Sequence, residues 1–153
     1  MGAGRVIVAC RPFAELTAGE LHDILALRCA VFVVEQSCPF QEIDGRDPEA
    51  LHLTLREAAL LAGYARLFAP DAAGRARIGR VVTSPARRGA GLGRKVMAAA
   101  IGEIGRRFGA VPIELAAQSH LRAFYEGFGF AAIAPEYLED GIPHLDMRRS
   151  AGA

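Results

Sequence analysis

The stretch RVVTSPARRGAGLGRKVMAAAI, from Arg80 to Ile101, decides the fold of this chain. It passes from a β-branched apolar segment through a glycine-rich basic turn into a helical pattern. Apolar residues recur about every 3.6 positions after the turn and predict a helix over 91–108. They are Leu92, Val96, Ala100, Ile101, Ile104 and Phe108. A strand over 75–84, this helix and a strand over 111–117 predict a crossover between parallel strands.

Short apolar or alternating segments flank this unit, each bounded by turn residues. Further strands are predicted over 5–13, 51–57, 59–70, 130–140 and 142–150. The order predicts an α/β fold with a mixed sheet of about seven strands. Its N-terminal half is antiparallel, and helices cover both faces.

Two more helices are predicted from cap signals. Thr17 and Glu20 have the spacing of a capping box, which predicts a helix over 17–34. Ser119 is the expected N-cap of a short helix over 119–128. After the first of these helices, the polar segment 35–50 predicts a long loop or a short broken helix, and loops of that length in a compact domain are often functional.

Composition bounds the remaining possibilities. The chain has 153 residues, of which 52% are hydrophobic and 23% charged, so we expect one domain over 1–153 with a core over about 5–149. A formal net charge of +1 gives no bulk attraction to nucleic acid or membrane. Its three cysteines form no CxxC pair and no metal-ligand spacing, so we expect free thiols, no metal and a reducing, cytoplasmic location.

The basic glycine turn has the chemistry of an anion site. A helix N-terminus carries unpaired amides and partial positive charge, and glycines let an anion approach those amides closely. Arg94 and Lys95 add charge where the helix dipole disfavours it, which suggests an anionic ligand such as a pyrophosphate. A P-loop or a dinucleotide-binding fingerprint fits less well, because each needs a glycine where Arg94 stands. The alternative is a tight strand-to-helix turn on a solvated basic face.

The pattern Arg88-x-x-Gly91-x-Gly93 after an apolar strand resembles the acetyl-CoA signature of the GNAT superfamily of acyl-CoA N-acyltransferases. FYEGFGF at 124–130 is similar to a second segment of that family, one helix and one strand downstream. The segments 31–47, 117–125 and 139–144 further resemble its ElaA-like branch. The resemblance covers nearly the whole chain and implies a GNAT-like sheet whose central parallel strands splay apart.

The resemblance also implies which residues bind acetyl-CoA as cosubstrate. The backbone of Val81, Val82 and Thr83 would pair with the pantetheine arm, and the Val82 amide would polarise the thioester carbonyl. Gln118 stands where the family often has an asparagine and would contact the same arm. The residues expected to cradle the pyrophosphate are Arg88, Gly89, Ala90, Gly91, Leu92, Gly93 and Arg94.

Catalysis by such an enzyme needs an acid for the leaving thiol and a base for the amine. Tyr125 occupies the family's tyrosine position and is the expected acid, the alternative being an aromatic contact to the cosubstrate. Glu114 is the candidate base, although strand alternation could point it away. Glu35, Glu42 and Asp44, with neighbouring Asp47, would attract a cationic acceptor, or they belong to a solvated loop.

Two histidines, His144 and His52, are candidates for lining the acceptor pocket, or they are structural. Cys38 has no neighbour in sequence that would activate it as a nucleophile, so direct transfer is expected rather than an acyl-enzyme.

The leading hypothesis is an acetyl-CoA-dependent N-acetyltransferase that moves an acetyl group directly to a primary amine. A non-catalytic acyl-CoA binding or sensing module is the main alternative, and a protein for another nucleotide phosphate is a third. The expected partner is a small-molecule or peptide amine. A homodimer is common in such folds, and the sequence leaves it open.

Overall fold

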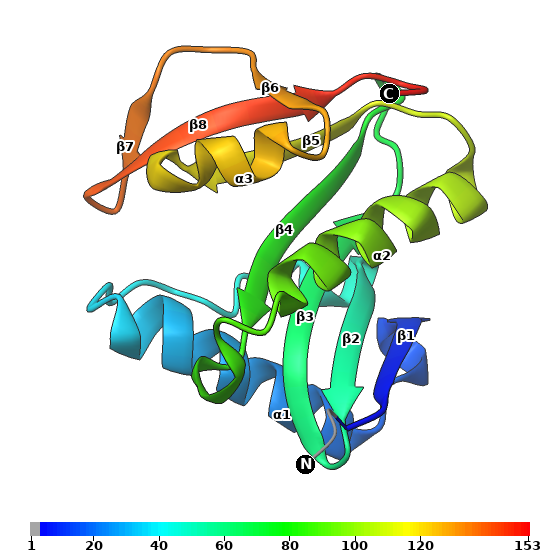
Figure 1. Cartoon of the computed structure of the whole chain (residues 1–153), viewed down its shortest axis with the longest axis vertical. Coiled ribbons are helices and arrows are strands. Elements are labelled where there is room, and N and C mark those ends of the chain that lie inside the picture. The colour runs from blue at the N-terminus through cyan, green and yellow to red at the C-terminus, as the bar shows by residue number, and fades with distance from the viewer. Residues whose placement is uncertain (1–3) are drawn as a thin grey trace.

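One mixed sheet of eight strands organises residues 4–153, which the computed structural model describes. The strand order is β1-β2-β3-β4-β5-β8-β6, with β7 paired to the outer part of β8 (Figure 1). The strands are β1 (Val6–Pro12), β2 (Leu51–Glu57), β3 (Leu60–Phe68), β4 (Ala76–Thr83), β5 (Ile113–Gln118), β6 (Phe130–Ala132), β7 (Tyr137–Glu139) and β8 (Ile142–Arg149). The predicted antiparallel N-terminal half is confirmed by β1 to β4.

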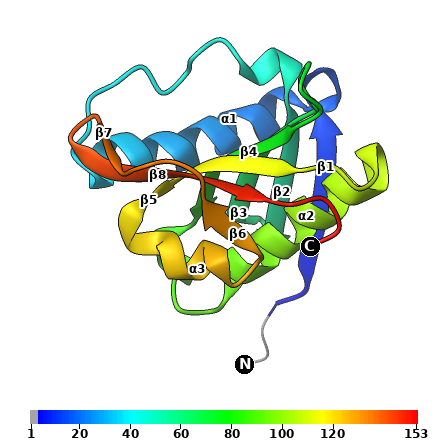
Figure 2. The same cartoon turned by 90° about the horizontal axis from the view of Figure 1, so that it is seen from above.

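Helices cover both faces of the sheet, as predicted. Figure 2 shows α1 (Ala18–Arg28) on one face, and α2 (Leu92–Phe108) with the short α3 (Arg122–Glu126) on the other. The larger apolar core lies between the sheet and α2, and a smaller one lies under α1. No helix among residues 4–153 is long and apolar enough to cross a membrane.

The start of α1 follows the predicted capping box. The Thr17 hydroxyl accepts a hydrogen bond from the Glu20 amide, and the Glu20 carboxylate accepts one from the Thr17 amide, both at 3.0 Å. The helix then changes pitch into a π-helical segment, Cys29–Glu35. That segment carries the chain to the loop over 36–46, which closes one side of the cavity described below.

Close contact with β3 fixes the position of α2. A Cβ built on Gly63 of β3 would lie 2.6 Å from Cγ2 of Val96, so only glycine fits between this strand and the helix. Leu92, Val96 and Ile104 are buried in the main core, which confirms the predicted apolar face. The helix begins after Gly91, whose φ of 75° lies in the left-handed region that favours glycine.

The central parallel strands separate along their length, as the family resemblance implies. β4 and β5 pair only at Ala76↔Ile113 and Arg77↔Glu114, at one end of the two strands. Beyond this point the remaining residues of β4 pair with β3 alone. The two halves of the sheet therefore diverge, and backbone groups along one edge of β4 have no partner strand.

Two local predictions were wrong. The expected strand over 130–140 is two short strands, β6 and β7, separated by a turn that contains Pro135, so the sheet has eight strands rather than about seven. Ser119 does not cap the helix over 119–128, because the chain first makes a 3-10 turn, Ser119–Leu121, and α3 begins after Leu121. The Ser119 hydroxyl is buried without a hydrogen-bond partner in the part of the chain that is described.

Candidate active site

A cavity of about 660 Å³ occupies the space where β4 and β5 diverge. Its walls come from β4, β5, the π-helical segment, the loop over 36–46, α3 and the turn between β7 and β8. Cys38 Sγ lies 3.8 Å from the carbonyl oxygen of Asp140, which joins the loop to the β7–β8 turn. These segments are far apart in sequence, and the splayed sheet brings them together.

The free edge of β4 can be assigned from its pairing with β3. The Ser84 amide donates to the Ala62 carbonyl at 2.8 Å, and Val82 is paired with Tyr64. Because backbone direction alternates along an antiparallel strand, Val82 faces β3 like Ser84. Val81 and Thr83 then face the gap. Val81, Val82 and Thr83 all line the cavity, but this pairing does not support the expected role of the Val82 amide, which faces β3.

A β-bulge in β4 accompanies the divergence. Tyr64 pairs with Val82 but Arg66 pairs with Gly79, so β4 has one more residue than β3 over this interval. Arg80 lies within the bulge and has a φ of 51°, which is unusual for a residue other than glycine. The bulge directs the Arg80 guanidinium to Glu42, with 2.7 Å between Nε and Oε2.

The glycine turn at the start of α2 has the backbone conformation that its sequence requires. Gly89 and Gly91 have φ values of 83° and 75°, and no other residue type adopts both positions without strain. Ala90 and Arg94 are exposed beside them, whereas Leu92 is buried in the core and contributes only its backbone to the turn. Gly93 faces Phe124 of α3, with 3.6 Å between a built Cβ and the ring.

Arg88 extends from this turn to the cavity and meets a carboxylate there. Its Nη2 lies 2.5 Å from Oε1 of Glu35, at the end of the π-helical segment. Both side chains are more than 40% exposed, at 46% and 42%, so water screens the pair and little stability comes from it. The two residues were expected to serve different ligands, and the structure brings them together at the cavity mouth.

Tyr125 lines the cavity from α3. Only 7% of the residue is exposed, and its ring packs edge-on against Phe124 and Phe130. Burial raises the pKa of the Tyr125 hydroxyl to about 12, so this group keeps its proton at neutral pH. A protonated hydroxyl in a cavity wall is suited to donating a proton.

Gln118 also lines the cavity, at the end of β5. Its Nε2 donates to Oε1 of Gln36 at 3.2 Å, and Gln36 is a cavity residue that sequence reasoning missed. Only the family position, and no local pattern, singled out Gln118.

Glu114 lies apart from the site. It is not among the residues that line the cavity, and its carboxylate receives Arg148 at 2.7 Å and Arg75 at 3.2 Å. It stands at the end of β5 that is still paired to β4. This placement does not support the expected role of Glu114 as a base.

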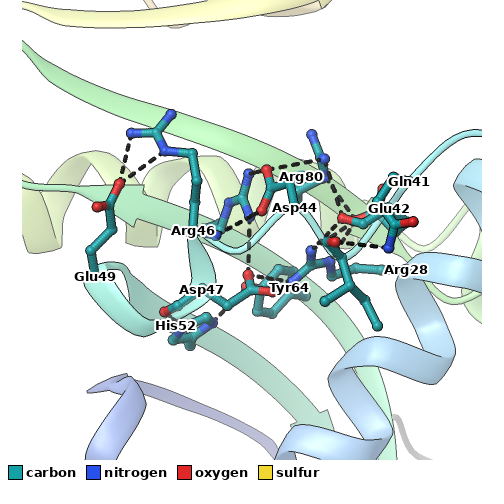
Figure 3. Close-up of polar contacts among 12 residues, drawn as sticks. Arg28, Gln41, Glu42, Asp44, Arg46, Asp47, Glu49, His52, Tyr64 and Arg80 are labelled. Atoms are coloured by element: carbon teal, nitrogen blue, oxygen red, sulfur yellow. Dashed lines mark hydrogen bonds and ion pairs between the residues drawn. The ribbon is translucent and has the colours of Figure 1, made fainter.

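Buried ion pairs connect the loop over 36–46 to the sheet (Figure 3). The ion-pair cluster consists of Arg28, Arg66, Arg80, Glu42, Asp44 and Asp47. Arg28 has no exposed surface and contacts Glu42 at 2.8 Å and Asp47 at 2.7 Å. The three arginines of the cluster balance its three carboxylates, and this pairing allows so many charges to be buried.

The carboxylates of the cluster are not solvated loop groups, which was the alternative expectation. Glu42 and Asp47 are each 4% exposed. Hydrogen bonds from Arg66 lower the pKa of Asp44 well below its usual range. Sequence reasoning missed the arginines, although Arg28 follows the apolar Ile24 by four residues, on the same face of a helix, which was a signal for a buried charge.

The two candidate histidines have different surroundings. His52 is 1% exposed, with Nδ1 at 2.7 Å from the Tyr64 hydroxyl and Nε2 at 2.9 Å from the Asp47 carbonyl. It does not line the cavity, so its expected pocket role is not supported. His144 lines the cavity from β8, opposite Gln118 of β5.

Neither a nucleophile nor a metal site is evident in the described part of the chain. Burial raises the pKa of the Cys38 thiol, which disfavours the reactive thiolate. Across residues 4–153 no group of three or more His, Cys, Asp or Glu side chains is arranged to hold a metal ion.

Known proteins resemble this chain over most of its length. The acetyltransferase (GNAT) domain family matches residues 20–151. Protein ElaA of Escherichia coli is 41% identical over 139 residues, which are 89% of this chain and 91% of ElaA. The crystal structure of an acyl-CoA N-acyltransferase from Pseudomonas aeruginosa is 44% identical and superposes with a TM-score of 0.91, covering 95% of this chain and all of that one.

The crystal structure of Escherichia coli ElaA gives a TM-score of 0.90 at 38% identity, over 95% of this chain. The sequence matches, the structural matches and the separated β4 and β5 strands all point to the same family. The chain belongs to the GNAT acetyltransferase family, in its ElaA-like branch, and is an acyl-CoA-dependent N-acyltransferase.

Proposed function

We propose that the protein transfers an acetyl group from acetyl-CoA directly to the nitrogen of a primary amine in the cavity between β4 and β5. The observation that carries this proposal is the free edge of β4. Its backbone at Val81 and Thr83 faces a cavity of about 660 Å³, beside a helix N-terminus that begins with left-handed glycines.

The residues of this site fit acetyl-CoA. Unpaired backbone groups of Val81 and Thr83 suit the amides of the pantetheine arm, much as an added strand pairs with a sheet edge. The turn from Arg88 to Arg94 suits the pyrophosphate, because its amides are unpaired and its glycines leave the backbone accessible. Arg88 would exchange Glu35 for a phosphate oxygen, since the ion pair is exposed and weak.

Acetyl-CoA supplies an activated thioester carbonyl, and the chain supplies polarisation and proton transfer. The Val81 amide would donate a hydrogen bond to the carbonyl oxygen, where negative charge develops during attack. The Tyr125 hydroxyl would protonate the leaving sulfur. Its raised pKa, about 12, keeps that proton available throughout the neutral range.

The part of the cavity wall formed by the ion-pair cluster supports the proposal that the acceptor is an amine. All ion pairs of Glu42 use Oε2, while Oε1 is buried without a partner in the described residues. A buried carboxylate oxygen without a donor is costly, and an N–H group of an acceptor would satisfy it. Glu35 and Asp44 also line the cavity.

The proposal is tested by thiol release with a set of acyl-CoA esters and a set of primary amines. We use acetyl-CoA, butyryl-CoA and octanoyl-CoA, each with butylamine, spermidine, lysine amide and phenylalanine amide. Amine-dependent release that is fastest with acetyl-CoA, together with an acetylated amine in the mass spectrum, is the expected result. Faster release with a longer ester, or amine-independent release alone, would contradict the proposal.

A further inference from the structure

We propose that His144 is the general base that removes the proton from the acceptor amine, and that Glu139 stabilises the protonated ring. The inference rests on the proposed function, because it assigns one step of the proposed transfer. It arises from the hydrogen bonds of His144, which fix where this imidazole can accept a proton.

The tautomer of His144 is determined by a backbone carbonyl. Nδ1 lies 2.7 Å from the carbonyl oxygen of Ile142. A carbonyl can only accept, so Nδ1 carries the hydrogen, and the lone pair of the neutral ring is on Nε2. His144 and Glu139 both line the cavity, and Nε2 lies 3.5 Å from Oε2 of Glu139, so we assign the basic nitrogen to the site.

Packing holds the ring in one orientation. Tyr137 of β7 stacks on His144 at 6.0 Å between ring centroids with an interplanar angle of 25°. The Tyr137 hydroxyl is itself held by Asp146 at 2.8 Å. The side chain of His144 is only 12% exposed. A fixed ring with a free lone pair loses little entropy when it binds an amine proton.

Glu139 faces the basic nitrogen of His144. Its Oε2 lies 3.5 Å from Nε2, close enough to stabilise an imidazolium and far enough to leave Nε2 without a short hydrogen bond. Glu139 is exposed, so its effect on the free energy of the charged ring is modest. The charged and titratable groups around the ring also include Tyr137, Asp146 and Arg77.

Three other carboxylates that line the cavity meet arginines in the structure without cosubstrate. Glu35 meets Arg88, Glu42 meets Arg28 and Arg80, and Asp44 meets Arg66. Hydrogen bonds from Arg66 lower the pKa of Asp44, so this carboxylate is a weak proton acceptor.

Histidines elsewhere offer no comparable base. Both ring nitrogens of His52 have short hydrogen bonds, and the residue lies outside the cavity. His120 lines the cavity but is exposed on a turn, and the described residues give its ring no carbonyl that would fix a tautomer. Only His144, among residues 4–153, combines cavity position with a preset lone pair.

The proposed step balances as follows. His144 Nε2 accepts one proton from the ammonium, and the neutral amine nitrogen forms a bond to the carbonyl carbon as the carbon–sulfur bond breaks. Tyr125 gives its proton to the leaving sulfur and regains one from the nitrogen that has become an amide. The net products are an amide, a thiol and one proton, which His144 releases to solvent.

The test uses His144→Asn, because an asparagine amide can still donate to the Ile142 carbonyl but has no basic nitrogen. The matched control is His22→Asn, which changes an exposed histidine on α1 outside the cavity. With acetyl-CoA and butylamine, we expect kcat of His144→Asn to fall roughly 10²–10⁴-fold while the control is unchanged. Its rate should recover as pH rises toward the range where butylamine is itself neutral.

The role of Glu139 is tested separately with Glu139→Gln. Removing its charge should lower kcat with butylamine and leave KM unchanged, because the ring that has accepted the proton loses an opposite charge 3.5 Å from Nε2. A structural role for Glu139 would instead lower stability and leave kcat unchanged.

The tautomer is read without any acceptor, by two-bond ¹H–¹⁵N NMR of the free protein labelled at histidine. The signal that His144→Asn removes should show a protonated Nδ1 and a lone pair on Nε2. A protonated Nε2 in the neutral ring would overturn the assignment, as would full turnover by His144→Asn. No release by wild type with any amine would contradict the proposed function, whereas release that is insensitive to His144 would contradict this inference alone.

Discussion

Removing the hydroxyl of Tyr125 separates acetyl-CoA binding from turnover most directly. Tyr125→Phe keeps the ring and its packing against Phe124 and Phe130, but has no proton to give. We expect kcat to fall roughly 10²-fold or more in a thiol-release assay, with acetyl-CoA affinity retained. A variant with wild-type kcat would show that the leaving thiolate needs no acid from Tyr125.

Buried charge makes Asp47 the most sensitive carboxylate of the ion-pair cluster. Although burial opposes it, hydrogen bonds from Arg28 and Arg66 lower the pKa of Asp47. Asp47→Asn leaves Arg28 and Arg66 undercompensated, and we expect the free energy of unfolding to fall by about 3–5 kcal/mol.

Urea unfolding measures this loss, and Glu49→Gln is its control. Glu49 pairs with Arg46 at the surface, with side chains 59% and 52% exposed, so its loss should cost less than about 1 kcal/mol. Equal effects of the two substitutions would contradict the importance of burial.

For single residues, the sequence predicted which residues lie at the site better than it predicted which way their backbone or side chains face. Tyr125, Gln118, Glu35, Glu42, Asp44 and His144 were expected at the site and all line the cavity. Val82 and Glu114 were placed by chain position, but backbone alternation and the depth at which β4 and β5 separate decide their roles. Neither property can be read from residue types, because both depend on how β4 pairs with its neighbours in the sheet.

Among the elements, the contact between α2 and β3 is the most demanding. Gly63→Ala would place a Cβ 2.6 Å from Cγ2 of Val96 and push α2 away from the sheet. We expect a loss of about 1–3 kcal/mol in the free energy of unfolding from overpacking. Adding Val96→Ala should restore part of it, measured by the double-mutant cycle, and strict additivity of the two losses would contradict the contact.

The elements with strong local signals were predicted, and those set by tertiary contacts were not. The capping box at Thr17 and Glu20 and the apolar stripe of α2 are confirmed. The turn between β7 and β8 has φ values of 51° and 78° at Asp140 and Gly141, its two central residues. The π-helical segment, Cys29–Glu35, carries no distinctive residue pattern and was missed. The division of β6 from β7 was also missed, although Pro135 is a strand-breaking residue between them.

For the whole molecule, His52 links stability to pH. Burial lowers the pKa of this ring in the folded state, so below pH about 6.5 the unfolded chain binds more protons. Stability is therefore complete above that pH and falls as pH decreases toward the folded-state pKa. Urea unfolding from pH about 8 to about 5 should show this slope.

His52→Gln should flatten the slope over that interval, whatever its effect on absolute stability. His22→Asn should not, because His22 is exposed on α1. An unchanged slope in His52→Gln would assign the pH dependence to other groups.

The fold as a whole could be predicted from the order of the elements and from two motifs, the glycine turn at 88–93 and the segment 124–130. The mixed sheet, the crossover and helices on both faces were all predicted. The acceptor, the cytoplasmic location and a homodimer stay predictions, because they depend on partners and surfaces for which the sequence has no signature.

The measurement that tests the account most directly is thermal unfolding with and without acetyl-CoA, on wild type, Gly91→Glu and Gly74→Glu. Both glycines have left-handed backbones, with φ of 75° and 77°, and no atom lies within 4 Å of a built Cβ at either, so the two substitutions strain the chain alike. Acetyl-CoA at about 100 times its Kd should stabilise wild type and Gly74→Glu by roughly 2.7 kcal/mol.

In Gly91→Glu this shift should disappear, because the new side chain carries a negative charge into the turn expected to hold the pyrophosphate. Retention of the full shift in Gly91→Glu, or its absence from wild type, would contradict acetyl-CoA binding at the glycine turn between β4 and α2.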